Sequence, residues 1–551
     1  MQKINGQVVF SASDVVHFME CEHLSALDRL HLDAPMARAK DSEEAALVQN
    51  RGFEHERAYL QKAKERAVSY IDIATVGESR DARVEATIDA MKRGVDLIYQ
   101  AAFFQAPMVG YADFLKKVDK PSMLGGHSYE IIDTKLSKKS RAKFIIQLAF
   151  YADLLEGVQG VPPELVYIVL GDGKEERFQL SDYRYYYQSL KQRFVSFLAA
   201  SEQQGVAHTA HNSTPFPCDK CDLCHWRERC NSWWDETDHL TQVANILKTH
   251  IHKLNAAGIQ TVEQLAKLPE TTRIPKISET VLQRLRHQAS LQHRAKVTGE
   301  RFVELLGPNA DQPAEPGPRG FARLPEPSPH DLFFDMEGFP HVEDGLEYLF
   351  GLYYIDDANE GVFKPIWGHD RAAEKLAFEE WVDFVIRHLE RHPEAHIYHY
   401  AAYEKTALRK LMRLHGTREN DIDHLLRTKK MIDLYQVVRE SVRISERSYS
   451  IKYVEKFYLA ARSAEVKSAG SSIVAYQNWR DSDPKDQEIL DEIEKYNKED
   501  VVSTYELLKW LCRQRPRDMP WLGENLSDES ASDTIGTRSD KALKFEARLS
   551  H

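Results

Sequence analysis

The sequence predicts an α/β protein built from more than one domain. Runs of β-branched and aromatic residues, such as YEIIDTKL and VYIVLGDG, indicate strands and alternate with the helical pattern of KFIIQLAFYADLLEGV. At 551 residues the chain is long enough for two to four domains, each with its own hydrophobic core. A segment rich in proline and glycine, GPNADQPAEPGPRGFARLPEPSP, predicts an extended linker between an N-terminal and a C-terminal part.

The changes of pattern along the chain define five consecutive regions. The first ends in a cluster of cysteines, the second is helical throughout, and the fourth opens on the apolar strand DLFFDMEGFP. The last is polar and of mixed charge, so we expect it to be disordered. The predicted boundaries are 1–240, 241–307, 308–327 for the linker, 328–515, and 516–551 for the tail.

Composition excludes several classes of protein. The chain is 42% hydrophobic and 29% charged, as in ordinary globular proteins, and it lacks the run of about 18 apolar residues that spans a membrane. The N-terminal residues MQKINGQVVFSASD lack the apolar stretch of a secretion signal. The placement of the cysteines favours a reducing compartment, so we expect a cytoplasmic protein. The motif G-x-x-x-x-G-K-[ST] is absent, so the sequence encodes no ATP-driven motor of that type.

The charge is negative overall and positive in two local stretches. A net charge of −12 argues against a protein that passively coats nucleic acid. Each positive stretch is either a nucleic-acid-binding surface or a solvated face. The two stretches contain Lys135, Lys138, Lys139, Arg141 and Lys143, and Arg284, Arg286, Arg294, Lys296 and Arg301.

Local patterns predict the elements of the first two regions. SASDVVHFMECEHLSALDRL predicts a helix capped by Ser11 or Ser13, with Cys21 on it or directly after it. MVGYADFLKKV and YEIIDTKL predict adjacent strands, which the helix KFIIQLAFYADLLEGV and the strand VYIVLGDG follow. HKLNAAGIQTVEQLAKLP predicts two short helices around Gly258, where the turn either offers backbone amides to a phosphate or serves packing alone.

Four elements of the first region carry side chains suited to hydrolysing a phosphodiester. That reaction needs acidic or imidazole ligands for a divalent ion and a cation that offsets the charge developing on the phosphate. Asp133 and Lys135 are two apart on a strand and point to one face, and Gln147 and Tyr151 are four apart on a helix. In chain order the candidates are His55, Asp113, Asp133, Lys135, Gln147 and Tyr151.

The order of these motifs resembles that of the RecB-type PD-(D/E)XK nucleases, which carry G-x-x-H, an Asp, D-x-K and Q-x-x-x-Y. The resemblance covers about residues 10–235 and implies a restriction-endonuclease-like fold. It implies that Mg²⁺ or Mn²⁺ is bound by His55, Asp113 and Asp133, with the Thr134 carbonyl as a further ligand. It also implies that Lys135 is catalytic, orienting water or stabilising the transition state, and that Gln147 and Tyr151 hold the DNA strand.

Four of the six cysteines lie in one short stretch, FPCDKCDLCHWRERC. Thiols at such spacings bind a metal or an iron–sulfur cluster more often than they form disulfides in a chain of this kind. Iron–sulfur members of the family carry one upstream cysteine and a downstream C-x-x-C-x-x-x-x-x-C, so the resemblance implies a structural [4Fe–4S] cluster on Cys21, Cys221, Cys224 and Cys230. The alternative is a local Zn²⁺ site on Cys218, Cys221, Cys224 and Cys230. The remaining cysteine, Cys512, is expected to be a buried apolar residue.

The fourth region carries a second set of acidic residues. Asp335 and Glu337 are two apart on an apolar strand, so both carboxylates face one way, which is unfavourable unless cations neutralise them. Far downstream, KYNKEDVVSTYELLKWL predicts a helix with Tyr496 and Asp500 four apart on one face. Between them lies Glu404, in HIYHYAAYEKTAL. Asp433, in KKMIDLYQVV, is an auxiliary acid or the cap of a helix or strand.

This arrangement resembles the Tyr-type DEDD exonucleases of the RNase H-like fold, which begin with D-x-E and end with Y-x-x-x-D. The resemblance spans about residues 328–515 and implies an RNase H-like domain. It implies that two ions are held by Asp335, Glu337, Glu404 and Asp500, and that Tyr496 positions the nucleophilic water. The middle motif, usually N-x-x-F-D, reads YAAYE here, which places both the reach of Glu404 and the positioning of the substrate in doubt.

Together the motifs predict a metal-dependent nuclease that acts on DNA ends, with single-stranded or unwound DNA as substrate and repair or defence as its role. RNA is a possible substrate of the second domain, and a separate helicase is a plausible partner because the chain encodes no motor. The alternative is a nucleic-acid-binding scaffold with one or both nuclease sites inactive. A third interpretation is a zinc-stabilised protein whose carboxylates serve only structure.

Overall fold

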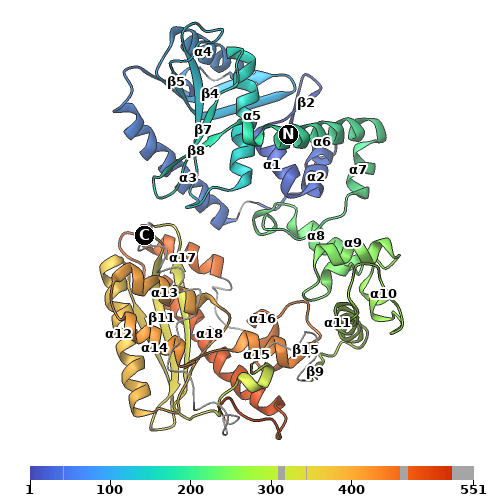
Figure 1. Cartoon of the computed structure of the whole chain (residues 1–551), viewed down its shortest axis with the longest axis vertical. Coiled ribbons are helices and arrows are strands. Elements are labelled where there is room, and N and C mark those ends of the chain that lie inside the picture. Colours follow the sequence, from blue (N-terminus) through green and yellow to red (C-terminus); the bar gives the residue numbers. More distant parts are fainter. Residues whose placement is uncertain (41, 78, 308–316, 343, 460–468, 524–551) are drawn as a thin grey trace, which may run out of the picture. The chain divides into compact units, whose positions relative to one another are not determined.

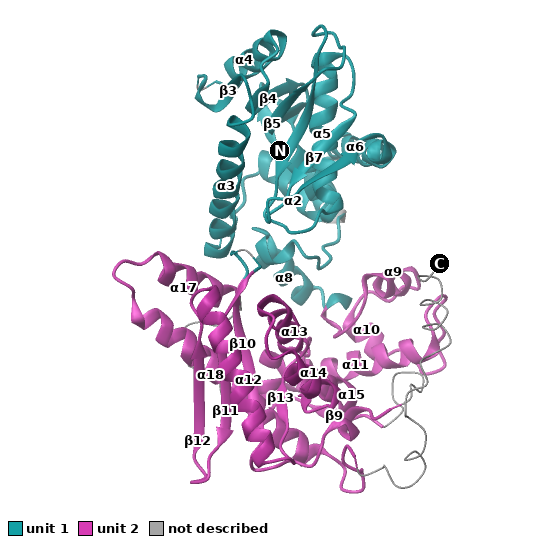
Figure 2. Cartoon of the chain, turned by 60° about the vertical axis from the view of Figure 1, so that its left-hand side comes forward, with its two compact units in different colours: residues 1–241, 340–344 teal, residues 242–339, 345–551 magenta. Residues whose placement is uncertain are grey.

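The structure is a computed structural model that describes residues 1–523, apart from 41, 78, 308–316, 343 and 460–468. The chain divides into two compact units, one formed by residues 1–241 with 340–344 and the other by 242–339 with 345–551 (Figure 2). The predicted linker lies outside the described residues from 308 to 316, and so does the predicted tail from 524 onward. Within the described residues, no helix has both the length and the apolar character needed to cross a membrane.

The first unit is built on a mixed sheet with the strand order β3-β4-β5-β6-β7-β8. β6 lies inside the sheet, antiparallel to β5 and parallel to β7, and all of its residues are buried. Ile131 packs in the cluster that contains the apolar residues of α5, whereas Ile132 packs with Leu60 of α3. The strands are β3 (Tyr70–Asp72), β4 (Leu97–Gln105), β5 (Met108–Val118), β6 (Ser128–Thr134), β7 (Leu165–Val169) and β8 (Glu175–Gln179).

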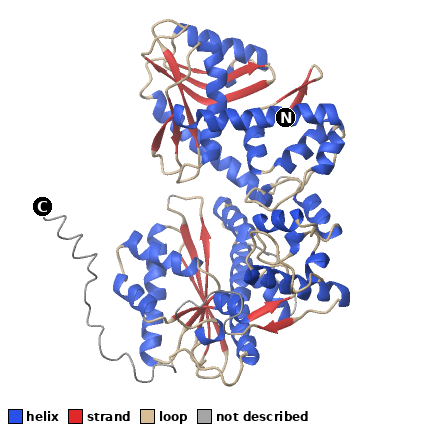
Figure 3. Ribbon diagram, turned by 45° about the vertical axis from the view of Figure 1, so that its right-hand side comes forward, coloured by secondary structure: helices blue, strands red, loops and turns tan. Residues whose placement is uncertain are grey.

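Helices pack around this sheet, and a small hairpin precedes them (Figures 1 and 3). The hairpin is β1 (Gln2–Ile4) with β2 (Gln7–Val9). The helices are α1 (Ala12–Glu20), α2 (Glu22–Asp33), α3 (Glu43–Lys64), α4 (Arg80–Arg93), α5 (Ala142–Gln159), α6 (Ser181–Gln204), α7 (Val206–Asn212) and α8 (Arg227–Glu236). Short 3₁₀ turns are η1 (Ile73–Thr75), η2 (Cys221–Leu223) and η3 (Leu240–Gln242).

Two helices occur where the sequence predicts one. Ser11 precedes α1 as predicted, and its backbone N–H donates to Asp14 Oδ2 at 2.8 Å. Cys21 then adopts an extended conformation, ends α1 and begins α2. Its Sγ accepts a hydrogen bond from the backbone N–H of Leu24 at 3.4 Å. A thiol therefore acts as the cap of α2, which places Cys21 in the break between the two helices.

The second unit is built on a sheet with the strand order β12-β11-β10-β13-β14. β10 is antiparallel to β11 and parallel to β13, and β13 is parallel to β14, the edge strand. Phe334 stacks against Trp381 of α12, with ring centroids 4.4 Å apart, whereas its neighbour Asp335 faces α18. The strands are β10 (Leu332–Phe339), β11 (Leu346–Ile355), β12 (Gly361–Trp367), β13 (Ile397–His399) and β14 (Met431–Asp433).

The helices of the second unit cover both faces of this sheet: α12 contacts β11 and β12, and α18 contacts β10 and β11 (Figure 1). They are α9 (Lys248–Ala256), α10 (Val262–Ala266), α11 (Glu279–Thr298), α12 (Arg371–Arg391), α13 (Tyr403–His415), α14 (Glu419–Arg427), α15 (Leu434–Ser441), α16 (Ile451–Val454), α17 (Ala469–Asp481) and α18 (Gln487–Gln514), with the 3₁₀ turns η4 (Gly320–Arg323) and η5 (Glu455–Phe457).

The described residues around the predicted linker form short elements that pack on the second unit. β9 (Val303–Leu305) pairs with β15 (Val442–Ile444), which ties the end of the helical region to the strand that follows α15, within the second unit. In the described part of the predicted linker, η4 packs against α15. Glu440 accepts from the backbone N–H of Gly320 at 2.8 Å and from Arg323 Nε at 2.6 Å. This carboxylate–guanidinium pair holds η4 against α15.

Candidate active sites and the cysteine cluster

In the first unit, β5 and β6 bring two acidic side chains together. Asp113 Oδ2 accepts hydrogen bonds from the backbone N–H and the Oγ1 of Thr134, at 3.0 and 3.1 Å. Lys135 follows directly, and its Nζ lies 2.5 Å from Asp133 Oδ2. Burial raises the pKa of Asp133 to about 7, with Lys135 opposing the shift and Asp113 adding to it. The site therefore joins a buried acid, Asp133, to a half-buried one, Asp113, with one cation in contact with Asp133.

The helix α3 supplies two further side chains to the same region. His55 Nε2 lies 3.3 Å from the carbonyl oxygen of Val169, which also accepts from the backbone N–H of Lys135 at 2.8 Å. Glu56 is buried and accepts from Gln100 Nε2 at 2.5 Å. Burial raises the pKa of Glu56, and the charge of Asp113 raises it further. Two neighbours on α3 thus approach the acid pair.

Sequence reasoning overlooked Glu56. The signal was available, because Glu56 is four residues before Leu60 and these two residues form the buried face of α3. A carboxylate on the buried face of a helix requires a polar or cationic partner. The pattern G-x-x-H points to the imidazole of His55 and does not include the acid that follows it.

Gln147 and Tyr151 both lie beside Asp133, as the predicted helix requires. Gln147 Nε2 is 3.5 Å from Asp133 Oδ1 and 3.2 Å from the Tyr151 hydroxyl. Tyr151 is buried, and burial raises its pKa. A Cβ at Gly110 would lie 3.1 Å from the Tyr151 ring, so this glycine makes room for it. These contacts orient the Asp133 carboxylate, and the predicted grip on DNA stays a prediction.

Donor atoms at metal-binding spacing occur in the second unit. Across the described residues, groups of three or more such atoms within 4.8 Å of one another are formed by Asp335, Glu337 and Asp500, and by His330, His392 and Glu394. The predicted ligands His55, Asp113 and Asp133 do not form such a group, and the imidazole lies against the Val169 carbonyl. Their role as metal ligands therefore stays a prediction.

The carboxylates of the second site come from β10 and α18. Glu337 is buried, and Asp335 and Asp500 are half-buried. Burial and the charge of Asp500 raise the pKa of Glu337 to about 8. Burial, followed by the charges of Asp500 and Glu337, also raises the pKa of Asp335 well above its usual value. Carboxylates crowded in this way are stable as anions only beside cations, so the set fits divalent ions.

Glu404 joins this cluster from the first turn of α13. Its carboxylate is buried, with Oε2 3.3 Å from Nδ1 of the fully buried His399. Its charge contributes to the raised pKa of Asp335. The structure therefore places all four predicted acids of the second site, Asp335, Glu337, Glu404 and Asp500, in one region. Whether each binds a metal stays a prediction.

Asp433 is a cap. Its Oδ1 accepts from the backbone N–H of Tyr435 in the first turn of α15 and from that of Ala401, each at 3.0 Å. Ala401 has a φ of +73°, a left-handed conformation that non-glycine residues seldom adopt. The bond from Asp433 supports this conformation three residues before Glu404. Of the two roles the sequence left open, the structure shows the cap.

Three residues of the second site were missed by sequence reasoning. Asn497 Nδ2 donates to Asp335 Oδ2 at 2.7 Å, and Ser472 Oγ donates to Glu337 Oε2 at 2.8 Å. Lys452 Nζ lies 5.3 Å from the ring centroid of Tyr496, the buried residue predicted to position water. Only Asn497 carried a signal, because it lies three residues before Asp500 on the same helix.

Five cysteines surround one cavity of about 230 Å³: Cys21, Cys218, Cys221, Cys224 and Cys230. Burial raises the pKa of Cys221 to about 11 and that of Cys230 to about 12. The five thiols are suited to bind a metal ion or an iron–sulfur cluster, because a bound metal deprotonates its thiol ligands. Cys218 Sγ and Cys221 Sγ are 3.9 Å apart. Zinc–sulfur bonds of about 2.3 Å hold sulfurs about 3.8 Å apart, so both ligand sets remain open.

Comparisons with protein families match both parts of the chain. Residues 22–231 match the PD-(D/E)XK nuclease superfamily, and residues 332–512 match the RNase_H superfamily. These matches confirm the predicted fold class, with a restriction-endonuclease-like domain at the N-terminus and an RNase H-like domain at the C-terminus. No curated protein matches the chain.

Proposed function

We propose that this chain, which joins a PD-(D/E)XK nuclease superfamily domain to an RNase_H superfamily domain, is a divalent-metal-dependent nuclease that trims the ends of single-stranded or unwound DNA. The observation that carries the proposal is the grouping of Asp335, Glu337 and Asp500, with donor atoms within 4.8 Å of one another. Burial raises the pKa of Asp335 and of Glu337, because it disfavours their charged forms. Bound cations would stabilise these carboxylates as anions.

In the RNase H-like domain, Asp335, Glu337, Glu404 and Asp500 would hold Mg²⁺ or Mn²⁺. Bound ions of this kind polarise the phosphate and lower the pKa of the attacking water. Asn497 and Ser472 orient the acids through the hydrogen bonds described above. Tyr496, one helical turn before Asp500, is positioned to orient water.

In the PD-(D/E)XK domain, Asp113 and Asp133, with Glu56 and His55 beside them, would hold the ion. Lys135 remains cationic, because the charges of Asp133 and Asp113 outweigh the burial that opposes the ammonium form and raise its pKa. Its Nζ, 2.5 Å from Asp133, is suited to stabilise negative charge on a phosphate bound at the acid pair. The proposal assigns Gln147 and Tyr151 to the DNA strand and to the orientation of Asp133.

The cysteine cavity supports a structural role. A group held by Cys21 from the α1–α2 turn and by Cys221, Cys224 and Cys230 would join the two ends of the first domain. Such a long cross-link restricts the unfolded chain. We favour a [4Fe–4S] cluster over zinc, because only the cluster set uses Cys21. A thiolate-bound group also favours a cytoplasmic location.

Digestion of end-labelled single-stranded DNA, double-stranded DNA and RNA, with Mn²⁺ or with EDTA, tests the proposal. The wild type should shorten the labelled strands only with the metal. Asp500→Asn should abolish the activity of the second domain and Lys135→Ala that of the first. Asp491→Asn, an exposed acid on α18, and Lys92→Ala, an exposed lysine on α4, are matched controls.

The outcomes separate the nuclease from a scaffold. If the wild type binds DNA but cleaves none of the substrates with either ion, the chain is a nucleic-acid-binding scaffold. If only one of the two variants loses activity, that site alone is catalytic. Addition of a helicase that unwinds duplex DNA should extend digestion to duplex substrates, because the chain encodes no motor of the P-loop type.

A further inference from the structure

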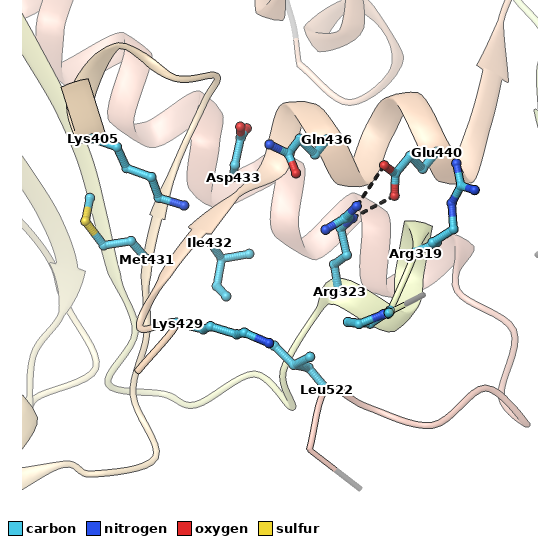
Figure 4. Close-up of a pocket in the computed structure, with 12 residues that line it drawn as sticks. Arg319, Arg323, Lys405, Lys429, Met431, Ile432, Asp433, Gln436, Glu440 and Leu522 are labelled. Atoms are coloured by element: carbon cyan, nitrogen blue, oxygen red, sulfur yellow. Dashed lines mark hydrogen bonds and ion pairs between the residues drawn. The ribbon is translucent and has the colours of Figure 1, made fainter. Parts of the chain in front are cut away.

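A cavity of about 430 Å³ lies along the outer edge of β14, and its lining includes none of the four acids of the proposed metal site. Four elements of the second unit enclose it: β14, the start of α13, α15 and the segment that contains η4 (Figure 4). Its volume is within the range of small-ligand sites, about 300–1,000 Å³. The lining includes Arg319, Arg323, Lys405, Lys429, Asp433 and Glu440.

Positive charge predominates in this cavity. Of its two carboxylates, Glu440 is paired with Arg323, through contacts of 2.6 and 3.0 Å, and also accepts from Gly320 N. Asp433 Oδ1 accepts two backbone N–H groups as a cap. Four basic side chains therefore face two acids that already have partners, and the cavity has an excess of cations.

Two of the basic side chains have no direct partner. In the part of the chain that the structure describes, neither Lys405 nor Lys429 makes a hydrogen bond or an ion pair, and Lys405 interacts with Asp433 only through the charge of that acid. Figure 4 shows both side chains directed toward the space between β14 and the Arg323–Glu440 pair. The adjacent Lys430 is different, because its Nζ donates to the carbonyls of Pro393 and Ala395. Lys430 supports the fold, whereas Lys405 and Lys429 are available to a ligand.

The backbone adds to the positive potential. Lys405 lies in the first turn of α13, whose preceding residue, Ala402, has no side chain able to cap the helix. The first backbone N–H groups of a helix lack partners within it and carry the positive end of its dipole. Lys429 lies in the turn before β14 and has a φ of +56°, a left-handed conformation that is unfavourable for lysine.

The cavity is next to the proposed metal site. Lys405 directly follows Glu404, and Asp433 at the end of β14 is paired in register with His399 on β13. His399 in turn lies 3.3 Å from Glu404. When a nucleic-acid strand is bound at the carboxylates, a neighbouring phosphate of the same strand is therefore able to reach the cavity.

We propose that this cavity binds a phosphate group of a nucleic-acid strand or of a released nucleotide, held by Lys405 and Lys429. The identity of the anion rests on the proposed nuclease function. The cavity and its positive charge are observed whether or not the chain cleaves nucleic acid. The cavity holds the strand, or the nucleotide just cut from it, beside the carboxylates.

Binding of a fluorescein-labelled oligodeoxythymidylate to the full chain tests this proposal. Asp500→Asn with Lys135→Ala serves as the background, so that the strand survives the measurement. Adding Lys405→Gln and Lys429→Gln should weaken binding about tenfold and reduce the slope of log affinity against log salt by about 0.7 for each phosphate that is no longer neutralised. Lys375→Gln, an exposed lysine on α12, should leave affinity within twofold. Lys405→Arg should retain most of the affinity.

Competition with deoxythymidine monophosphate and with inorganic phosphate distinguishes the two sources. A nucleotide that competes only when both lysines are present identifies the cavity as a site for a released or terminal nucleotide. If the lysine substitutions weaken binding of the oligonucleotide but neither competitor displaces it, the cavity binds an internal phosphate of the strand. Either result supports the proposal. Equal affinity and salt slope in the lysine variants, with unchanged melting temperatures, would overturn it. Cleavage by the wild type is scored separately, so failure of the nuclease function is distinguished from failure of the cavity.

Discussion

Asn497 Nδ2 donates a hydrogen bond of 2.7 Å to Asp335 Oδ2, joining residues 162 positions apart. The contact connects α18 to β10 in the RNase H-like domain. Asn497 is fully buried, so its amide serves this carboxylate rather than solvent.

We predict that Asn497→Ala lowers the rate of nucleic-acid cleavage by the second domain at least tenfold. A hydrogen bond to a charged group contributes about 1.5–3 kcal/mol, and about 1.4 kcal/mol corresponds to a factor of ten. Single-turnover digestion across a range of Mn²⁺ concentrations measures the effect. Asn478→Ala, an exposed amide on α17, is the matched control. Wild-type turnover in Asn497→Ala would show that the amide has no part in positioning Asp335.

Gly351→Ala should disrupt the hydrogen bond between Asn497 and Asp335 by displacing the Asn497 side chain. Asp335 and Gly351 face each other across β10 and β11, and a Cβ at Gly351 would lie 1.7 Å from Asn497 Oδ1. Overpacking of this kind costs about 1–3 kcal/mol. The melting temperature and the cleavage rate of the second domain should both decrease. Gly307→Ala, where a Cβ meets nothing within 4 Å, should leave both unchanged.

The metal-free second domain should lose stability as pH rises from about 4.5 to about 8. Burial and the charge of Asp500 raise the pKa of Glu337 from its usual 4.5 to about 8. The unfolded chain loses this proton near pH 4.5, whereas the folded chain keeps it until about pH 8, so folding becomes less favourable across that window. Melting in EDTA at pH 5 to 8 measures the trend.

Two comparisons test this pH dependence. Glu337→Gln should flatten it, because the amide has no proton to release. Mn²⁺ should raise the melting temperature more at pH 8 than at pH 6, because the ion competes with the proton for the carboxylates. A wild-type stability in EDTA that falls with pH no more than that of Glu337→Gln would contradict the assignment.

In the first domain, Glu56→Gln should reduce cleavage about 10- to 100-fold, the usual cost of losing a residue that supports a metal site. Glu56 is buried beside the acid pair, and burial followed by the charge of Asp113 raises the pKa of Glu56. Glu54→Gln, an exposed residue on the same helix, is the control. Cleavage should be measured in the Asp500→Asn background, which leaves only the first site active.

Substitution of single cysteines distinguishes the two thiolate groups. A [4Fe–4S] cluster predicts that Cys21→Ser removes the visible absorption of anaerobically purified protein, while Cys218→Ser retains it. A zinc site predicts colourless protein whose bound zinc is lost in Cys218→Ser and kept in Cys21→Ser. Cys512→Ser, at a residue outside the cavity, should change neither readout. Absorption spectra and metal analysis on the same samples provide the answer.

Sequence patterns were sufficient for the elements and for the residues that recur in short motifs. Alternation on β10 placed Asp335 and Glu337 on one face, and the helical period of α18 placed Tyr496 and Asp500 on another. The strands β5 and β6 and the helix α5 also lie where the pattern predicts them. These features depend on local geometry, which repeats every two residues in a strand and every 3.6 in a helix.

The sequence by itself determined two nuclease folds, their acidic residues and the cysteines that gather at the first domain. Only the tertiary structure decided which distant residues meet those acids: Glu56 at Asp113, Asn497 at Asp335, and Ser472 at Glu337. It also decided that Asp433 is a cap and that Lys405 and Lys429 line one cavity. The physical reason is that local periodicity sets the direction of a side chain, whereas the packing of remote elements selects its partner.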